Sequence, residues 1–173
     1  MSLDFRTLDL KDALDLAISI EEEAKERYDV FVSQVGGGRY PGDAADMFRL
    51  MAGYETKHCA ELATRRRALF GDAPRRIDKE SIDDVEAPDR GTPRVFMSAR
   101  QAMEVALASE EKAHAFFDGA LPHVADPKVK ALFEELRKEE EEHIRLVRQR
   151  LEKLPPGPDV EEDEADEPGS DAG

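Results

Sequence analysis

Residues 48–58 read FRLMAGYETKH, and residues 133–143 read FEELRKEEEEH. Both stretches share one spacing, in which a Phe is followed by an apolar residue, then a Glu, then a His. The steps of three and four residues between these positions keep their side chains on one face of a helix. Glu55 and Glu140 therefore interrupt faces that are otherwise apolar, and a lone carboxylate on a buried face is costly.

A second pattern repeats ahead of each of these stretches. Residues 17–28 read AISIEEEAKERY, and residues 106–117 read ALASEEKAHAFF. Both contain Ala, Glu-Glu, Ala and an aromatic residue at matching positions, and Glu21 and Glu110 occupy the same place in the pattern. The chain is therefore predicted to contain two copies of one helical hairpin. The first helix of each copy contributes a Glu, and the second contributes a Glu-x-x-His.

The polar residues on these apolar faces are predicted to meet in one layer of a bundle. In an antiparallel hairpin, residues at equal distances from the turn lie at equal heights. Within each hairpin, the two Glu residues differ in their distance from the turn by one to three residues, which is about 1.5–4.5 Å of helix rise. The residues expected to converge are Glu21, Glu55, His58, Glu110, Glu140 and His143.

This set of side chains is suited to a pair of metal ions. Carboxylate oxygens together with imidazole nitrogens bind iron, manganese and, less selectively, zinc. Four carboxylates balance the charge of two divalent cations, which removes the cost of burying them. A Glu and a His three residues apart on a helix reach the same ion. We therefore expect a pair of divalent metal ions as the cofactor, with iron, Mn and Zn as the candidates, and no catalytic residue beyond the metal ligands.

Composition excludes several other classes of protein. The chain has 173 residues, a formal net charge of −15 and a single cysteine, Cys59. The negative charge disfavours nucleic-acid binding, and one cysteine cannot form a disulfide within the chain or a four-cysteine metal module. The start of the chain does not resemble a secretory signal, and no apolar run approaches the roughly 20 residues needed to cross a bilayer. A reducing, cytoplasmic setting is expected.

Turn and capping signals predict an all-α four-helix bundle. The helices are expected over about 8–35, 44–70, 98–121 and 127–154. Residues 72–97 lack helical periodicity, and we interpret them as a long crossover between the second and third helices that brings the third helix back parallel to the first. The predicted bundle occupies residues 1–154. Residues 155–173 contain many Asp and Glu but no Lys or Arg, and they are predicted to be a disordered acidic tail.

With these motifs, the chain resembles the ferritin-like superfamily, and within it the rubrerythrin branch. The resemblance implies that the six convergent residues bind a non-haem di-iron centre that reacts with dioxygen or hydrogen peroxide. It also implies a homodimer, while the external electron donor stays unknown. Two features depart from rubrerythrins. The chain lacks the four cysteines of a rubredoxin module, and Ala113 occupies the position one turn after Glu110 where an additional glutamate is usual.

The sequence leaves three functions open. The first is a di-iron oxidoreductase of the peroxidase or ferroxidase type, and the second is iron storage or delivery. The third is a non-enzymatic bundle that binds a partner through its acidic tail. Tyr28 also has two interpretations. In the first, its hydroxyl supports the site by a hydrogen bond to a ligand carboxylate, and in the second, its ring is an ordinary part of the aromatic core.

Overall fold

The computed structural model describes residues 3–36, 39–78, 80, 82, 85–91 and 93–156. These residues form four long helices and no strand, which confirms the predicted all-α bundle. The helices are α1 (Leu10–Gln34), α2 (Ala44–Phe70), α3 (Ala99–Ala120) and α4 (Pro127–Lys153), and a short 3₁₀ turn, η2 (Leu121–His123), follows α3.

Local sequence signals set the start of each helix. The side chains of Asp9, Asp43 and Asp126 each accept hydrogen bonds from backbone N–H groups in the first turn of the helix that follows. Ser98 and Gln101 form the predicted capping box at the start of α3. These caps satisfy N–H groups that have no partner within the helix, so the helix starts are encoded locally.

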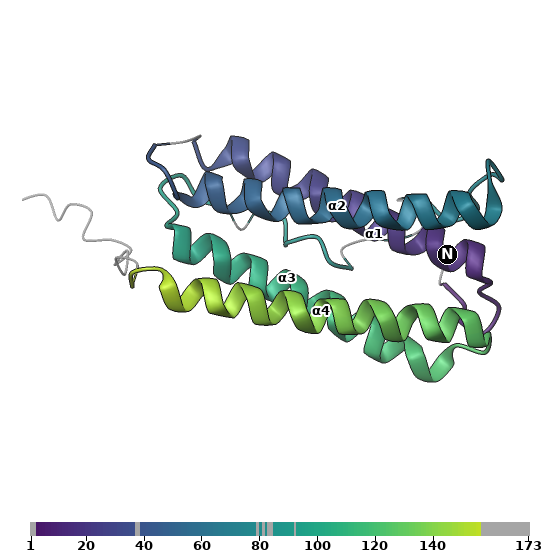
Figure 1. The fold of residues 1–173 in the computed structure, drawn as a ribbon. Coiled ribbons are helices and arrows are strands. Elements are labelled where there is room, and N and C mark those ends of the chain that lie inside the picture. Colours follow the sequence, from purple (N-terminus) through teal and green to yellow (C-terminus); the bar gives the residue numbers. More distant parts are fainter. Residues whose placement is uncertain are drawn as a thin grey trace, which may run out of the picture.

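The four helices are arranged as two antiparallel hairpins. α1 packs along α2, and α3 packs along α4 (Figure 1). The connector between the end of α2 and the start of α3 comprises residues 71–98, and its described residues run back along the bundle. As a result α3 runs parallel to α2 and antiparallel to α1, and the expected parallel arrangement of the first and third helices is wrong. A connector that spans the whole bundle must return the chain to the end at which α2 began.

Two apolar clusters fill opposite ends of the bundle, and a polar layer separates them. The first cluster includes Leu14, Phe117 and Phe133, and the second includes Phe48 and Met103. Glu21, Glu55, Glu110 and Glu140 each come between first-cluster and second-cluster residues in sequence along their own helix. The bundle therefore encloses these carboxylates between two hydrophobic regions that exclude water.

The ends of the chain are described only in part. Most of the predicted acidic tail, residues 157–173, lies outside the described residues, so the predicted disorder and the domain boundary at residue 154 stay predictions. No helix among the described residues is both long enough and apolar enough to cross a membrane.

Candidate metal centre

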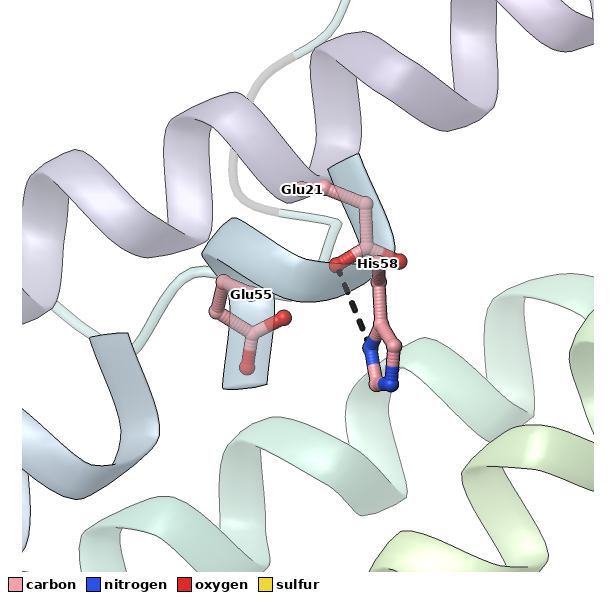
Figure 2. Close-up of side chains that lie close together, drawn as sticks. All are labelled: Glu21, Glu55 and His58. Carbon is pink, nitrogen blue, oxygen red and sulfur yellow. Dashed lines mark ion pairs between the residues drawn. The ribbon is translucent and has the colours of Figure 1, made fainter. Parts of the chain in front are cut away.

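The six residues singled out in the sequence come together in the middle of the bundle. Ligand atoms of Glu21, Glu55 and His58 lie within 4.8 Å of one another, and the equivalent residues Glu110, Glu140 and His143 form a second group with the same spacing. Figure 2 shows the first group, with the carboxylates from α1 and α2 and the imidazole of His58 directed into the same space. Each helical hairpin therefore supplies one group of two carboxylates and one histidine.

The four carboxylates are almost completely shielded from solvent. Their residues are 0–4% exposed, with Glu55 the least exposed and Glu21 the most. The two histidines lie nearer the surface, because the side chains of His58 and His143 are 16% and 14% exposed. The imidazole side of the site is therefore the side that faces solvent.

The two histidines come from different hairpins and contact each other. The rings of His58 and His143 stack with centroids 4.4 Å apart and planes inclined by 5°. His58 follows Glu55 by three residues, and His143 follows Glu140 by three residues. Each helix therefore directs its Glu and its His to the same side. The stack joins α2 and α4 at the level of the carboxylates.

A fifth buried carboxylate belongs to the layer, and helical periodicity did not predict it. Glu86 belongs to the connector and is 1% exposed. Its ligand atoms group with those of Glu21 and Glu140, and separately with those of Glu55 and Glu110, at the same 4.8 Å limit. The fifth carboxylate of the layer thus comes from the connector and not from one of the four helices. The only sequence signal was a Glu placed between two apolar residues, Val85 and Ala87, in a connector without periodicity.

Burial and mutual repulsion oppose the charged forms of these carboxylates. Burial raises the pKa of Glu21 to about 7. Burial also raises the pKa values of Glu55, Glu86 and Glu140 well above their usual range, and neighbouring carboxylates add to this effect. Without cations, the layer therefore retains protons at a pH where an exposed glutamate is ionised.

The two histidines respond differently to their surroundings. Burial lowers the pKa of His58 to about 4. Burial also acts against the charged form of His143, but a hydrogen bond with Glu110 and the charge of nearby carboxylates raise its pKa. Because metal ligation requires a neutral imidazole, His58 is available as a ligand over a wider pH range.

Unpaired buried atoms show that a metal pair fits this site. Atoms with no hydrogen-bond partner within the described residues include both carboxylate oxygens of Glu55, one oxygen each of Glu21, Glu86 and Glu140, and Nδ1 of His58. Buried polar atoms of this kind are normally paired, and cations are the partners that satisfy several carboxylates together. Two ligand atoms at about 2.1 Å from one ion lie at most roughly 4.2 Å apart, so only small side-chain shifts would be needed.

Tyr28 lies in the second apolar cluster and is fully buried. Its hydroxyl has no hydrogen-bond partner within the described residues. Burial, together with the charges of Glu110 and Glu55, raises the pKa of this phenol well above its usual value. The ring is thus a core aromatic close to the carboxylate layer, and its role as a supporting residue for a metal ligand stays a prediction.

Comparison with known proteins identifies the family. A sequence profile described as the ferritin-like domain matches residues 38–156, which is more than half of the chain. The chain belongs to the ferritin-like family. The comparison with curated proteins returned no match.

Two solved structures share the fold of this chain. The chain is similar to an uncharacterized conserved protein from Magnetospirillum magnetotacticum, with 28% identity and a TM-score of 0.64 over 86% of this chain and 97% of that one. It also shares its fold with a hypothetical protein from Pyrococcus furiosus, with 21% identity and a TM-score of 0.53 over 84% of this chain and 89% of that one. Neither description states an activity.

Proposed function

We propose that this ferritin-like protein is a di-iron oxidoreductase of the rubrerythrin-like peroxidase or ferroxidase type. The observation that carries the proposal is the pair of equivalent groups, each with two carboxylates and one histidine, enclosed between two apolar clusters. The chemistry that an iron pair supplies is two one-electron oxidations, which match the two-electron reduction of hydrogen peroxide to water.

The chain's own residues would provide ligands, charge and shielding. Glu21, Glu55 and His58 would hold one ion, and Glu110, Glu140 and His143 would hold the other. The carboxylates offset the positive charge of the ions, and they favour iron or manganese over softer metals. The apolar clusters on both sides would keep water away from the bound ions, which would strengthen the electrostatic interactions between the ions and their ligands.

A small cavity offers an approach for the oxidant. It lies beside His58, has a volume of about 80 Å³ and is lined by residues of α2 and α4. A water molecule occupies about 30 Å³ in the liquid, so hydrogen peroxide would fit. Among the lining residues, Arg65 and Glu135 form an ion pair at 2.9 Å. We propose that small oxidants reach the site from this side, where the two histidines are partly exposed.

Anaerobic titration with Fe(II) tests the proposal. We expect the wild-type chain to saturate at two ions and to oxidise both when peroxide is added. Glu140→Gln removes a buried candidate ligand, whereas Glu134→Gln changes an exposed residue of the same helix in the same way. The first variant should lose or greatly weaken one binding event, and the second should behave as wild type. A wild-type chain that binds no iron, or a Glu140→Gln variant with unchanged binding, would contradict the proposal.

Several further expectations accompany this function. We propose a homodimer, an external electron donor and a reducing, cytoplasmic setting, with Mn or Zn able to replace iron at the site. Gel filtration and iron loading distinguish the alternative of iron storage, because a storage protein would form a large shell and load far more than two ions per chain. Truncation before residue 155 tests the alternative of partner binding through the tail, because unchanged oxidation kinetics would place the tail outside the chemistry.

A further inference from the structure

The connector brings Glu86 to a position that neither hairpin reaches. Two groups of carboxylates combine residues from both hairpins. One contains Glu21 and Glu140, the other contains Glu55 and Glu110, and Glu86 belongs to both groups. Each of the other two groups draws all its members from one hairpin. Glu86 therefore lies between the two halves of the site, where a single carboxylate can face both ions.

Side chains from two helices hold the backbone of this part of the connector. The Ser109 hydroxyl of α3 donates a hydrogen bond to the carbonyl of Glu86. Lys112 Nζ, also from α3, donates to the carbonyl of Ala87 at 2.8 Å. From the opposite side, Arg27 of α1 donates to the carbonyl of Pro88 at 2.6 Å. Three successive carbonyls are thus fixed by flanking helices.

This clamp occupies the space between α1 and α3. Within the described residues, the backbones of these two helices do not come into close contact, although both bind the connector. Val85 packs against the first apolar cluster, and Ala87 is fully buried. Apolar residues on both sides of Glu86 therefore anchor the chain, and the carboxylate between them is directed into the polar layer.

The side chain itself lacks the partners that a buried carboxylate normally has. One oxygen of Glu86 has no hydrogen-bond partner within the described residues. Its neighbours at the site are four other carboxylates, and the ionised form of a fifth beside them is unfavourable unless cations lie between them. An anchored backbone that holds a buried carboxylate with one unpaired oxygen is the arrangement expected of a metal ligand.

We propose that Glu86 is a seventh ligand that faces both ions, so that the connector is part of the metal centre. The inference rests on the proposed function, because it requires that two ions bind. Five carboxylates carry −5, so the filled site has a charge of −1 with two divalent ions and +1 with two trivalent ions. Compared with a site of only the four helical carboxylates, the additional negative charge of Glu86 therefore favours the two trivalent ions over the two divalent ions. Binding of the ions would also hold the connector against the bundle.

The test compares the full-length wild-type chain with Glu86→Gln and a matched control, Glu80→Gln, an exposed glutamate of the same connector. Co(II) binding is measured by titration against a competing chelator, and amide hydrogen exchange of residues 85–91 is measured with and without the metal. We expect wild type and the control to bind two ions and to exchange more slowly when loaded. Glu86→Gln should bind at least one ion about 10-fold more weakly and lose the metal-dependent protection.

The outcomes separate this inference from the proposed function. If wild type and Glu86→Gln bind two ions with equal affinity and equal protection of the connector, the inference fails and the proposed function stands. If the wild-type chain binds no Co(II) or Fe(II), both fail. Glu86→Asp, which keeps the charge on a shorter side chain, provides a second variant. It should bind more tightly than Glu86→Gln if the carboxylate is a ligand, and equally if it is not.

Discussion

The two halves of the site have the same sequence pattern but different surroundings. In the second half, His143 Nδ1 lies 3.2 Å from a Glu110 oxygen and 3.4 Å from a Glu140 oxygen. In the first half, His58 Nδ1 lies 3.9 Å from a Glu21 oxygen and has no hydrogen-bond partner within the described residues. The repeat thus sets which residues meet, whereas the packing around them sets how they interact.

The aromatic residue that follows each first-helix glutamate differs as well. Tyr28 follows Glu21 by seven residues and lies in the second apolar cluster, while Phe117 follows Glu110 by seven residues and lies in the first. The two helices approach the layer from opposite ends, so equivalent positions meet opposite cores. Two metal positions built in this way should be similar in ligand type and unequal in affinity.

Removal of the metal tests whether both halves depend on cations. A ligand that binds only the folded state at 1,000 times its dissociation constant adds about 4 kcal/mol to the free energy of unfolding. We expect chelation to lower the unfolding free energy by roughly this amount for each ion bound with such affinity. Chemical denaturation with and without chelator measures the effect. Equal stability of the loaded and chelated protein would show that the carboxylate layer is stable without cations.

The pH dependence of the metal-free protein should be dominated by the glutamates. Burial raises the pKa of Glu21 from 4.5 to about 7, so the folded state retains a proton that the unfolded state releases. Stability of the metal-free protein should therefore fall as the pH rises from 4.5 through 7, by about 1.4 kcal/mol per pH unit for each such group. Glu55, Glu86 and Glu140 act in the same direction.

His58 acts in the opposite direction. Its pKa is lowered to about 4, so its contribution to stability is lost as the pH falls from 6.5 to 4. One histidine opposes several glutamates, and we expect the metal-free protein to be less stable at pH 7.5 than at pH 5.5. Denaturation in the presence of a chelator measures this, and the loaded protein is the control in which the trend should flatten or reverse. A metal-free protein that gains stability over this interval would contradict the account.

Matched histidine variants test the difference between the halves directly. His58→Ala and His143→Ala remove the same ring and the same stacking contact, so the difference between them isolates the contacts with carboxylates. In the metal-free protein, His143→Ala should cost about 1–3 kcal/mol more, because it leaves a buried Glu110 without its hydrogen-bond partner. Equal losses in the two variants would show that the closer contacts of His143 contribute no stability.

The smallest effect is expected at Tyr28. Tyr28→Phe removes a buried hydroxyl that has no partner within the described residues, so the metal-free protein should gain up to about 1 kcal/mol. Phe117→Tyr, the reverse change at the equivalent position, should be destabilising. The metal affinity of Tyr28→Phe separates the two interpretations of this residue. A loss of about 10-fold or more would indicate a hydrogen bond to a ligand carboxylate in the loaded protein.

Sequence predicted what local spacing encodes and missed what depends on contacts between distant segments. The helix starts at Asp43, Ser98 and Asp126 are each set by capping residues within one turn, so they were predictable. The six convergent residues were predictable because helical periodicity and distance from a turn together give direction and height.

Glu86 was not predictable by the same reasoning. It lies in a connector with no periodicity, among several other acidic residues. Its burial depends on hydrogen bonds to the connector backbone from Arg27, Ser109 and Lys112, which are 23 or more residues away in the sequence. Local spacing contains no information on such contacts. The direction of α3 was also misjudged, although the length of the connector was enough to determine it.

The most direct test of the central claim is anomalous scattering from crystals of the iron-loaded protein, measured on both sides of the iron absorption edge. We expect two iron positions about 3.5–4 Å apart, one beside Glu21, Glu55 and His58 and the other beside Glu110, Glu140 and His143. An absence of iron from this layer, or iron bound only at surface carboxylates, would contradict it.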